Sequence, residues 1–217
     1  MATELLEARL PRLRPALEGP GGPTDHGPVR HGDGDGGSSA FDPGRFGLWA
    51  FLGTLTMLFI GFTSAYIVRR TAVDWRPLPA PRLLWWNTAA LLLSSGVLQR
   101  ARRHQASLDL SGLKKALAVT ALLALAFAGG QLQAWRLLAA RGFFLATNPH
   151  GSFFYLLSGV HLAHLTGGLV WFLLVLFRLR ASGYATPAGT RTLSLFATYW
   201  HFLGLLWVYV VVLIFAF

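Results

Sequence analysis

The sequence contains five apolar segments, and none of them includes Asp, Glu, Lys or Arg. Each is near the roughly 20 residues that a helix needs to cross the hydrocarbon core of a bilayer. Lipid offers no partners to open backbone groups, so apolar runs of this length cross it as helices. The sequence therefore predicts an all-α, polytopic transmembrane helix bundle with five spanning helices, at residues 46–68, 83–99, 116–135, 152–177 and 193–217.

Composition supports a membrane location and removes several classes of function. Of the 217 residues, 53% are hydrophobic and only 13% are charged, whereas a soluble domain of this size carries more polar surface. The chain contains no cysteine, which removes disulfides, thiolate metal ligands and thiol nucleophiles. The net charge is +10, but the basic residues separate the apolar segments instead of forming one stripe, so we expect no nucleic-acid partner.

Residues 1–44 differ from the rest of the chain in composition. They are rich in Gly, Pro, Asp and Arg, with Gly-rich runs at residues 19–23 and 32–39. Such a segment buries too little apolar surface to offset the entropy lost when its chain becomes ordered. We therefore predict two regions, a disordered cytoplasmic N-terminal tail at 1–44 and a five-helix transmembrane domain at 45–217.

The distribution of Lys and Arg predicts the orientation of the helices. With the N-terminus inside, thirteen of the 19 basic residues lie on the inner side and six on the outer side. Cytoplasmic loops carry the excess of Lys and Arg in multi-pass proteins. We expect a cytoplasmic N-terminus and a multi-pass location in a bacterial-type cytoplasmic (inner) membrane. The outer aromatic belt would then include Trp75, Trp85, Trp86 and Trp135.

Three histidines lie inside the predicted spans, His161 and His164 in the fourth and His201 in the fifth. Residues three apart share one helix face, so the first two are suited to ligate a haem or a metal together with a facing helix. The alternative is that neutral imidazoles hydrogen-bond to neighbouring helices. We favour this alternative, because the spans offer no carboxylate to support a bound metal. The remaining candidates, His104 and His150, are expected in loops.

The other polar and small residues of the spans point to packing. The absence of Asp and Glu from the spans argues against a proton-coupled transporter, which needs such groups near the midplane. Asn87 and Gln131 are expected to hydrogen-bond between helices, and Gly167 and Gly168 to let helices approach closely.

The spans also carry short motifs in a definite order. They are Phe46-Gly47-Leu48-Trp49-Ala50-Phe51-Leu52 with Met57-Leu58-Phe59 and Ala65-Tyr66; Asn87-Thr88 with Leu93-Ser94-Ser95; Gly130-Gln131 with Trp135; Ser152-Phe153-Phe154-Tyr155 with His161, His164 and Gly167-Gly168; and Tyr199-Trp200-His201-Phe202 with Leu206-Trp207. In this order and at this spacing, they resemble subunit III of the haem–copper oxidases, from residue 46 to residue 217.

The resemblance implies a five-helix form that lacks the two leading helices of longer family members. It implies a non-redox accessory subunit of a respiratory haem–copper terminal oxidase, in the first place a cytochrome c oxidase, without a catalytic centre of its own. The implied partners are oxidase subunits I and II and membrane phospholipids. Haem and copper are expected in the partner subunits and not in this chain. The implied role is to stabilise subunit I and sustain proton uptake during oxygen reduction.

Two positions depart from the family's pattern. Many members have Ser-Glu where this chain has Thr54-Leu55, and many have Asp where it has Gly204. Roles of those acidic residues therefore do not carry over. The departures leave open an equivalent subunit of a quinol oxidase or a nitric oxide reductase. A stand-alone haem-binding or transport membrane protein is the third hypothesis.

The candidate site is thus one of packing and lipid contact. No residue is predicted to be catalytic, cofactor-binding or metal-binding. The residues expected to pack the helices or to contact lipid are Asn87, Gln131, His161, His164, Gly167, Gly168, Trp200 and His201.

Overall fold

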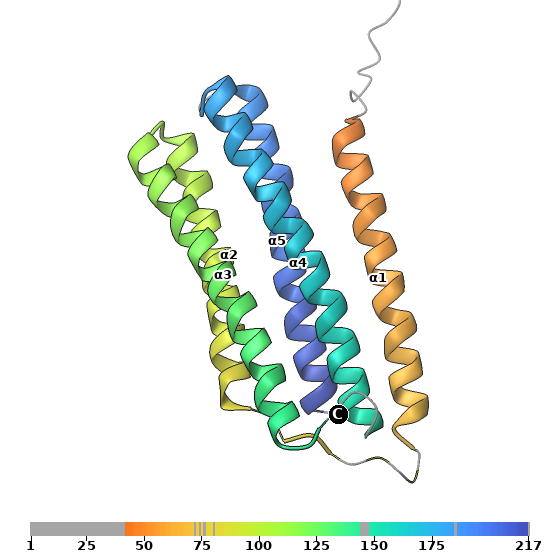
Figure 1. The fold of residues 1–217 in the computed structure, drawn as a ribbon. Coiled ribbons are helices and arrows are strands. Elements are labelled where there is room, and N and C mark those ends of the chain that lie inside the picture. The colour runs from red at the N-terminus through yellow and green to blue at the C-terminus, as the bar shows by residue number, and fades with distance from the viewer. Residues whose placement is uncertain are drawn as a thin grey trace, which may run out of the picture. The chain divides into compact units, whose positions relative to one another are not determined.

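Five helices form the described part of the molecule. The computed structural model describes residues 42–71, 73, 75, 77–79, 81–143, 148–184 and 186–216. Residues 1–41 of the tail predicted at 1–44 therefore lie outside the described residues. The described residues contain no strand. The helices are α1 (Pro43–Arg69), α2 (Arg82–Ala106), α3 (Leu110–Ala140), α4 (Pro149–Ser182) and α5 (Pro187–Phe215) (Figure 1).

Each helix begins before the apolar segment that predicted it, because polar caps start four of the five. The side chains of Asp42, Asp109, Asn148 and Thr186 accept hydrogen bonds from backbone N–H groups in the first turns of α1, α3, α4 and α5. Proline follows the cap of α1, α4 and α5, where its missing N–H costs nothing. These caps satisfy N–H groups that the helix itself leaves open.

Four of the five helices, α1, α3, α4 and α5, are long and apolar enough to cross a membrane. Large hydrophobic side chains such as Met57, Leu122 and Leu205 are about two-thirds exposed in the bundle, as expected of residues that face lipid. The protein is therefore a multi-pass membrane protein. α2 has 25 residues, about 37 Å at 1.5 Å per residue, but its last two turns carry Arg100, Arg102 and Arg103.

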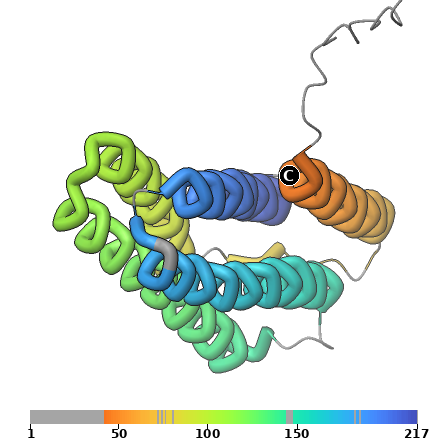
Figure 2. The backbone as a smooth tube through the Cα atoms, turned by 90° about the horizontal axis from the view of Figure 1, so that it is seen from above, coloured from red at the N-terminus to blue at the C-terminus, as the bar shows by residue number. Residues whose placement is uncertain are grey.

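α5 lies at the centre of the bundle. It contacts α1, α2 and α4, while α3 contacts α2 and α4. Figure 2 shows α5 between α1 and α2, with α4 alongside. The most extensive contact joins α2 to α3, which run antiparallel through the tight turn at residues 107–109. The C-terminal helix therefore holds together segments that are far apart in the sequence.

Buried residues recur every three or four positions on α2, α3 and α4, as in helix bundles packed at shallow angles. On α5 the buried set covers a much wider part of the circumference. The stripe of α3, for example, consists of Leu113, Ala116, Leu117, Thr120, Ala124, Phe127, Gln131, Ala134 and Leu138.

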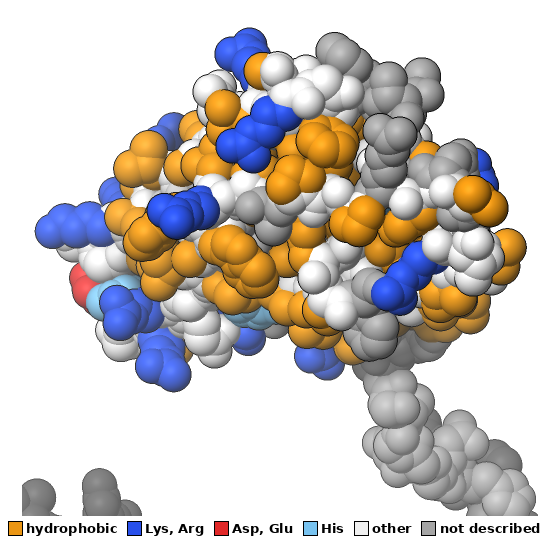
Figure 3. All heavy atoms as spheres, turned by 90° about the horizontal axis from the view of Figure 1, so that it is seen from below, with side chains coloured by type: hydrophobic (Ala, Val, Ile, Leu, Met, Phe, Trp, Pro, Cys, Tyr) orange, Lys and Arg blue, Asp and Glu red, His pale blue; other side chains and the backbone are white. Residues whose placement is uncertain are grey.

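The ends of the bundle carry the basic residues. Figure 3 views the end at which α1 finishes and α2 begins, and shows Lys and Arg side chains among extensive hydrophobic surface. Trp85 and Trp86, in the first turn of α2, are more than half exposed. Basic and aromatic residues around an apolar middle are the arrangement expected at a membrane interface.

Candidate functional site

The centre of the bundle is organised by two tryptophans of α5. Trp200 and Trp207 are seven residues apart and almost fully buried. The Trp200 Nε1–H donates to Ser94 Oγ at 3.0 Å, and the Trp207 Nε1–H donates to Thr88 Oγ1 at 3.0 Å. Both acceptors lie on α2, so the two bonds fix the antiparallel register and the rotation of α5 against α2. A buried indole requires such a partner.

Gly168 of α4 lies where α5 comes closest. A Cβ at this position would lie 2.9 Å from Tyr199 Cε1 and 3.4 Å from Trp200 Cζ3, so only glycine fits the present packing. The Tyr199 hydroxyl donates to the His164 carbonyl at 2.7 Å, one turn away on α4. Gly167 has no heavy atom within 4 Å of its Cβ position. Of the two glycines, Gly168 alone serves the helix contact that we expected.

Two of the three membrane histidines do not bond directly to other helices as predicted. His161 is fully buried between the rings of Phe127, at 5.8 Å, and Trp207, at 4.8 Å, and neither ring nitrogen has a hydrogen-bond partner among the described residues. The His164 Nδ1–H donates to the Val160 carbonyl of its own helix at 2.7 Å. The predicted direct hydrogen bonds from these two rings to other helices are not found among the described residues, because His161 faces aromatic rings and His164 bonds within its own helix.

His201 follows Trp200 on α5 and is half-buried. Within the described residues, no three His, Asp or Glu side chains come together as a metal-binding group would. The absence of haem and metal from this chain stays a prediction.

Asn87 and Gln131 are both buried, as packing residues should be. The Asn87 side chain lies against Gly130 so closely that a Cβ there would overlap it. This contact joins α2 to α3 near the outer ends predicted from the basic residues. The Asn87 Nδ2 and both polar atoms of the Gln131 amide have no hydrogen-bond partner among the described residues.

A second cluster, not predicted from the sequence, lies at the C-terminal end of α1, the end that the basic residues predict to be the outer one. His150, expected in a loop, lies in the first turn of α4 and is 5% exposed. Its Nδ1 accepts from the Leu78 N–H at 2.9 Å, so its Nε2 carries the proton and donates to the Ile214 carbonyl at 3.1 Å. Trp75 stacks on the imidazole with ring centroids 4.7 Å apart.

Tyr66 completes this outer cluster. It is 1% exposed, and its ring lies 5.2 Å from that of Trp75 and 5.5 Å from that of Phe153. A cavity of about 360 Å³ adjoins it, lined also by Arg70, His150 and the last residues of α5. The cluster thus joins α1, the connection to α2, α4 and α5. The local sequence indicated only that a helix starts before His150, through the cap residue Asn148 and the following Pro149.

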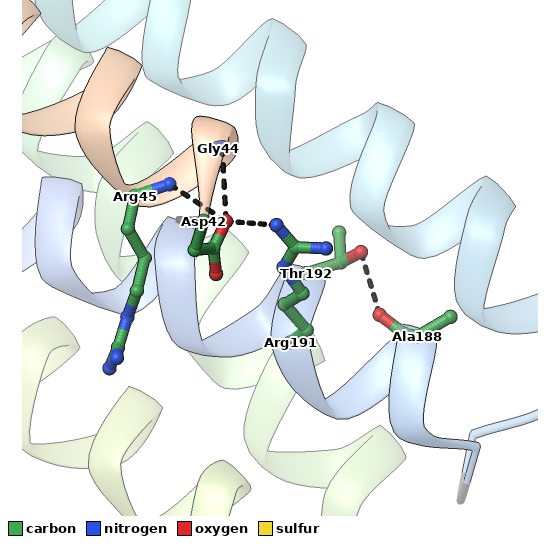
Figure 4. Close-up of polar contacts among 6 residues, drawn as sticks. All are labelled: Asp42, Gly44, Arg45, Ala188, Arg191 and Thr192. Carbon is green, nitrogen blue, oxygen red and sulfur yellow. Dashed lines mark hydrogen bonds and ion pairs between the residues drawn. The ribbon is translucent and has the colours of Figure 1, made fainter. Parts of the chain in front are cut away.

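An ion pair holds the N-terminal end of α1, the end predicted to be the inner one. The Arg191 guanidinium of α5 pairs with the Asp42 carboxylate, which also accepts the N–H groups of Gly44 and Arg45 (Figure 4). Desolvation raises the pKa of Asp42, but the hydrogen bonds from the Arg45 N–H and from Arg191 together outweigh it and hold this pKa below 3.8. The Arg45 side chain extends away from Asp42 in Figure 4. An adjoining cavity of about 540 Å³ also contacts Thr190.

The α2–α3 turn carries a second exposed contact with a carboxylate, made here by a histidine ring nitrogen. His104, also expected in a loop, lies in the last turn of α2, and its Nδ1 is 2.9 Å from Asp109 Oδ2. A hydrogen bond from the Gly112 N–H, together with the attraction of His104, lowers the pKa of Asp109 below its ordinary value. A Cβ on Gly112, in the first turn of α3, would meet both side chains, which would have to move aside.

The two family departures occupy packed positions. Leu55 is 3% exposed and belongs to the apolar core of α1. Gly204 of α5 lies against α2, where a Cβ would be 3.3 Å from Ser95 Oγ. That hydroxyl has no hydrogen-bond partner among the described residues. A larger polar residue at position 204 would therefore point at an available hydroxyl.

Comparison with known proteins gives consistent matches. The family described as cytochrome c oxidase subunit III matches residues 39–217. The cytochrome c oxidase subunit 3 of Synechocystis is 30% identical over 175 residues, which are 78% of this chain and 74% of that protein. A probable cytochrome c oxidase subunit 3 of Mycobacterium bovis is 31% identical over 75% of this chain and 82% of its own length. The quinol oxidase subunit 3 of Bacillus subtilis is 28% identical over 76% of this chain and 82% of its own length.

Proposed function

The chain belongs to the cytochrome c oxidase subunit III family, and on that premise we propose that it is a non-redox accessory subunit of a respiratory haem–copper terminal oxidase. In this role it stabilises subunit I and sustains proton uptake while the complex reduces oxygen. The observation that carries the proposal is the match over residues 39–217, which includes all five helices. Its partners are oxidase subunits I and II and membrane phospholipids.

Cytochrome c is the electron donor that we propose first. Relatives named cytochrome c oxidase subunit 3 are 30–31% identical to this chain, and relatives named quinol oxidase subunit 3 are 28% identical. The small difference makes a quinol oxidase the second candidate. Oxygen uptake by the purified complex with reduced cytochrome c, and separately with a quinol, distinguishes them. Turnover with quinol alone would select the second candidate.

The accessory role is tested by removing the subunit from the purified complex. We expect the depleted oxidase to begin near its normal rate and to lose activity faster during sustained turnover. Oxygen uptake is followed over many turnovers, with the haem and copper content measured before and after. Loss of the first turnover, with haem and copper retained in subunit I, would show that this chain supplies a catalytic group.

The absence of a cofactor from this chain has its own test. The spans carry no carboxylate or thiol, and His161 rests against Phe127 and Trp207. We expect the separated chain to show no Soret band after purification. A stoichiometric haem absorbance would favour the stand-alone haem-binding protein instead.

We also propose that α2 crosses the membrane, which gives five spans with a cytoplasmic N-terminus in a bacterial inner membrane. α2 packs along α3 and α5, both long enough to cross, and its arginines would lie in the inner headgroup region. The chain has no cysteine, so single introduced thiols report sidedness. An impermeant maleimide added to intact cells should label Thr71→Cys and not Ser107→Cys. Labelling of both would mean that α2 does not cross, and the reverse pattern would invert the orientation.

A further inference from the structure

Three buried side chains at one level of the bundle leave polar atoms without partners. They are Asn87 of α2, Gln131 of α3 and His161 of α4, and each is at most 5% exposed. The unpaired atoms are the Asn87 Nδ2, both polar atoms of the Gln131 amide, and both ring nitrogens of His161. In a membrane-embedded core such groups are costly, because neither solvent nor lipid satisfies them. Their presence on three helices calls for a common partner.

Contacts between α2 and α3 bring the first two together. Asn87 lies against Gly130, the residue immediately before Gln131. Because glycine has no Cβ, the Asn87 amide approaches the α3 backbone at the level of Gln131. Both side chains belong to the buried stripes of their helices, so both face the interior of the bundle.

Contacts between α3 and α4 bring His161 to the same level. Its ring lies 5.8 Å from that of Phe127, one turn before Gln131. One turn after Gln131, the Trp135 Nε1–H donates to Ser158 Oγ at 3.0 Å, and Ser158 lies one turn before His161. Residues four apart are neighbours on a helix face. Gln131 therefore faces the part of α4 between Ser158 and His161.

α5 closes the fourth side without satisfying these atoms. The Trp207 ring lies 4.8 Å from His161 and 5.1 Å from Phe127. Its only N–H is already donated to Thr88, the neighbour of Asn87. Trp207 thus packs against His161 and gives its N–H to another residue, so it leaves the polar atoms of His161 free.

We propose that Asn87, Gln131 and His161 form an internal site that binds one or a few water molecules. The two amides provide donors and an acceptor, and a neutral imidazole provides one of each. A buried water needs two to four polar partners, and this set offers them from three helices. Bridging water satisfies these atoms and fastens α2, α3 and α4 to one another. The inference does not depend on the electron donor or on the accessory role.

The first experiment tests whether the unpaired polar atoms of these side chains have hydrogen-bond partners in the folded protein. In the intact complex, Gln131→Leu should lower the temperature at which the subunit unfolds by about 2–4 °C or more, because it leaves the remaining groups of the site short of a partner. The matched control is Gln133→Leu, at an exposed position of the same helix, which should cause little change. A higher unfolding temperature, or a change equal to that of the control, would mean that the site holds no water and would overturn the proposal.

The second experiment separates bound water from direct bonds among the three side chains. A cryo-EM map of the wild-type complex, at a resolution that shows ordered water, should contain a peak about 2.7–3.2 Å from polar atoms of at least two of them. Side chains bonded to one another, with no peak between them, would overturn the proposal even if Gln131→Leu is destabilising. The map decides the question by itself if that variant fails to assemble.

Discussion

α1 and α5 are both long and apolar enough to cross the membrane, yet they are held in opposite ways. In the most apolar stretch of each helix, 56% of the residues of α5 are buried inside the bundle, but only 22% of those of α1. α5 contacts three other helices and carries two tryptophans bonded to α2. Among the described helices α1 contacts α4 and α5, and its glycines Gly47, Gly53 and Gly61 face open space. Apolar length therefore predicts a span but not its share of the packing.

The attachment of α1 is concentrated towards its ends. Asp42 pairs with Arg191 at the inner end, and Tyr66 packs into the aromatic cluster with His150 at the outer end. Between them, the Thr63 and Tyr209 hydroxyls lie 2.6 Å apart. We infer that α5 sets the geometry of the bundle, whereas α1 leaves most of its face to lipid or to partner subunits. Perturbing contacts of α5 should consequently cost more than perturbing those of α1.

The largest effect is expected for Gly168→Leu. The new side chain would overlap Tyr199 and Trp200, and overpacking of this kind typically costs about 1–3 kcal/mol. α4 and α5 would separate while the oxygen chemistry in the partner subunits stays untouched. The complex should start near its normal turnover and then lose activity faster than wild type. Oxygen uptake during sustained cycling measures the difference.

Gly167→Leu is the matched control for this prediction. It adds the same side chain at the adjacent residue, where a Cβ meets nothing within 4 Å. Its complex should retain activity as long as wild type. Equal decay of the two variants would show that the effect comes from lost glycine flexibility, and not from the contact with α5.

Trp200→Phe is expected to have the next largest effect. It keeps an aromatic ring but removes the donor to Ser94 Oγ, and leaving a buried group unpaired costs about 1–3 kcal/mol. Ser94→Ala removes the acceptor, so the double variant should lose less stability than the two single losses added. Thermal unfolding of the subunit in the complex supplies all three values. Additive losses would show that the hydrogen bond contributes nothing.

The corresponding substitution on α1 sharpens the comparison. Trp49 is 65% exposed, so Trp49→Phe removes an indole that has no role in the bundle. A surface change of this kind usually stays within about 0.5 kcal/mol. A loss as large as that of Trp200→Phe would mean that α1 is packed against a partner as tightly as α5 is packed within this chain.

Much of the fold was predictable because the membrane imposes a strong pattern on sequence. Uncharged runs near 20 residues identified all five helices, and the structure extends each at its start. The caps at Asp42, Asp109, Asn148 and Thr186 were visible in the sequence and would have given closer bounds. Helix starts follow from local hydrogen bonding, which depends on a few adjacent residues.

The direction in which an individual residue points from its helix was not predictable in this way. Gly167 and Gly168 are chemically identical neighbours, and a rotation of about 100° along the helix decides which one meets Tyr199. Lipid-facing and protein-facing sides are both apolar in a membrane, so polarity does not distinguish them. His150 shows the same limit, because its partners Leu78 and Ile214 are 72 and 64 residues away in sequence.

A smaller effect is expected at the outer end of α1 for His150→Phe. The ring can still stack on Trp75, but Leu78 loses the acceptor of its N–H, and Ile214 loses its donor. We expect faster amide exchange in the α1–α2 connection, measured by hydrogen–deuterium exchange of the complex. His104→Phe, at the opposite end of the bundle, serves as the control. Unchanged exchange near Leu78 would show that aromatic packing alone holds this end.

The smallest effect is expected at the inner end of α1, for Asp42→Asn. Asparagine caps a helix about as well as aspartate, so the variant keeps the start of α1 and removes only the charge paired with Arg191. The Arg191 side chain is 53% exposed and the Asp42 side chain 28%, and ion pairs this accessible to solvent contribute little and weaken with salt. Gly44→Cys with Leu195→Cys reports the separation, because a Cβ on Gly44 lies 3.5 Å from Leu195 Cδ1.

Disulfide formation between these thiols should fall modestly when Asp42→Asn is added. This deficit in yield, relative to the same double-cysteine protein with Asp42, should be greater at low salt than at high salt. The pKa of Asp42 is lowered in the folded protein, so its contribution is complete above the ordinary value of 3.8 and disappears only as pH falls through the lowered pKa. The deficit should therefore be the same at pH 5 and pH 8. Arg45→Gln, which removes a neighbouring charge that points away from Asp42, should leave the yield unchanged. Loss of all cross-linking in Asp42→Asn would mean that this one ion pair, and not the outer cluster, decides whether α1 stays against α5.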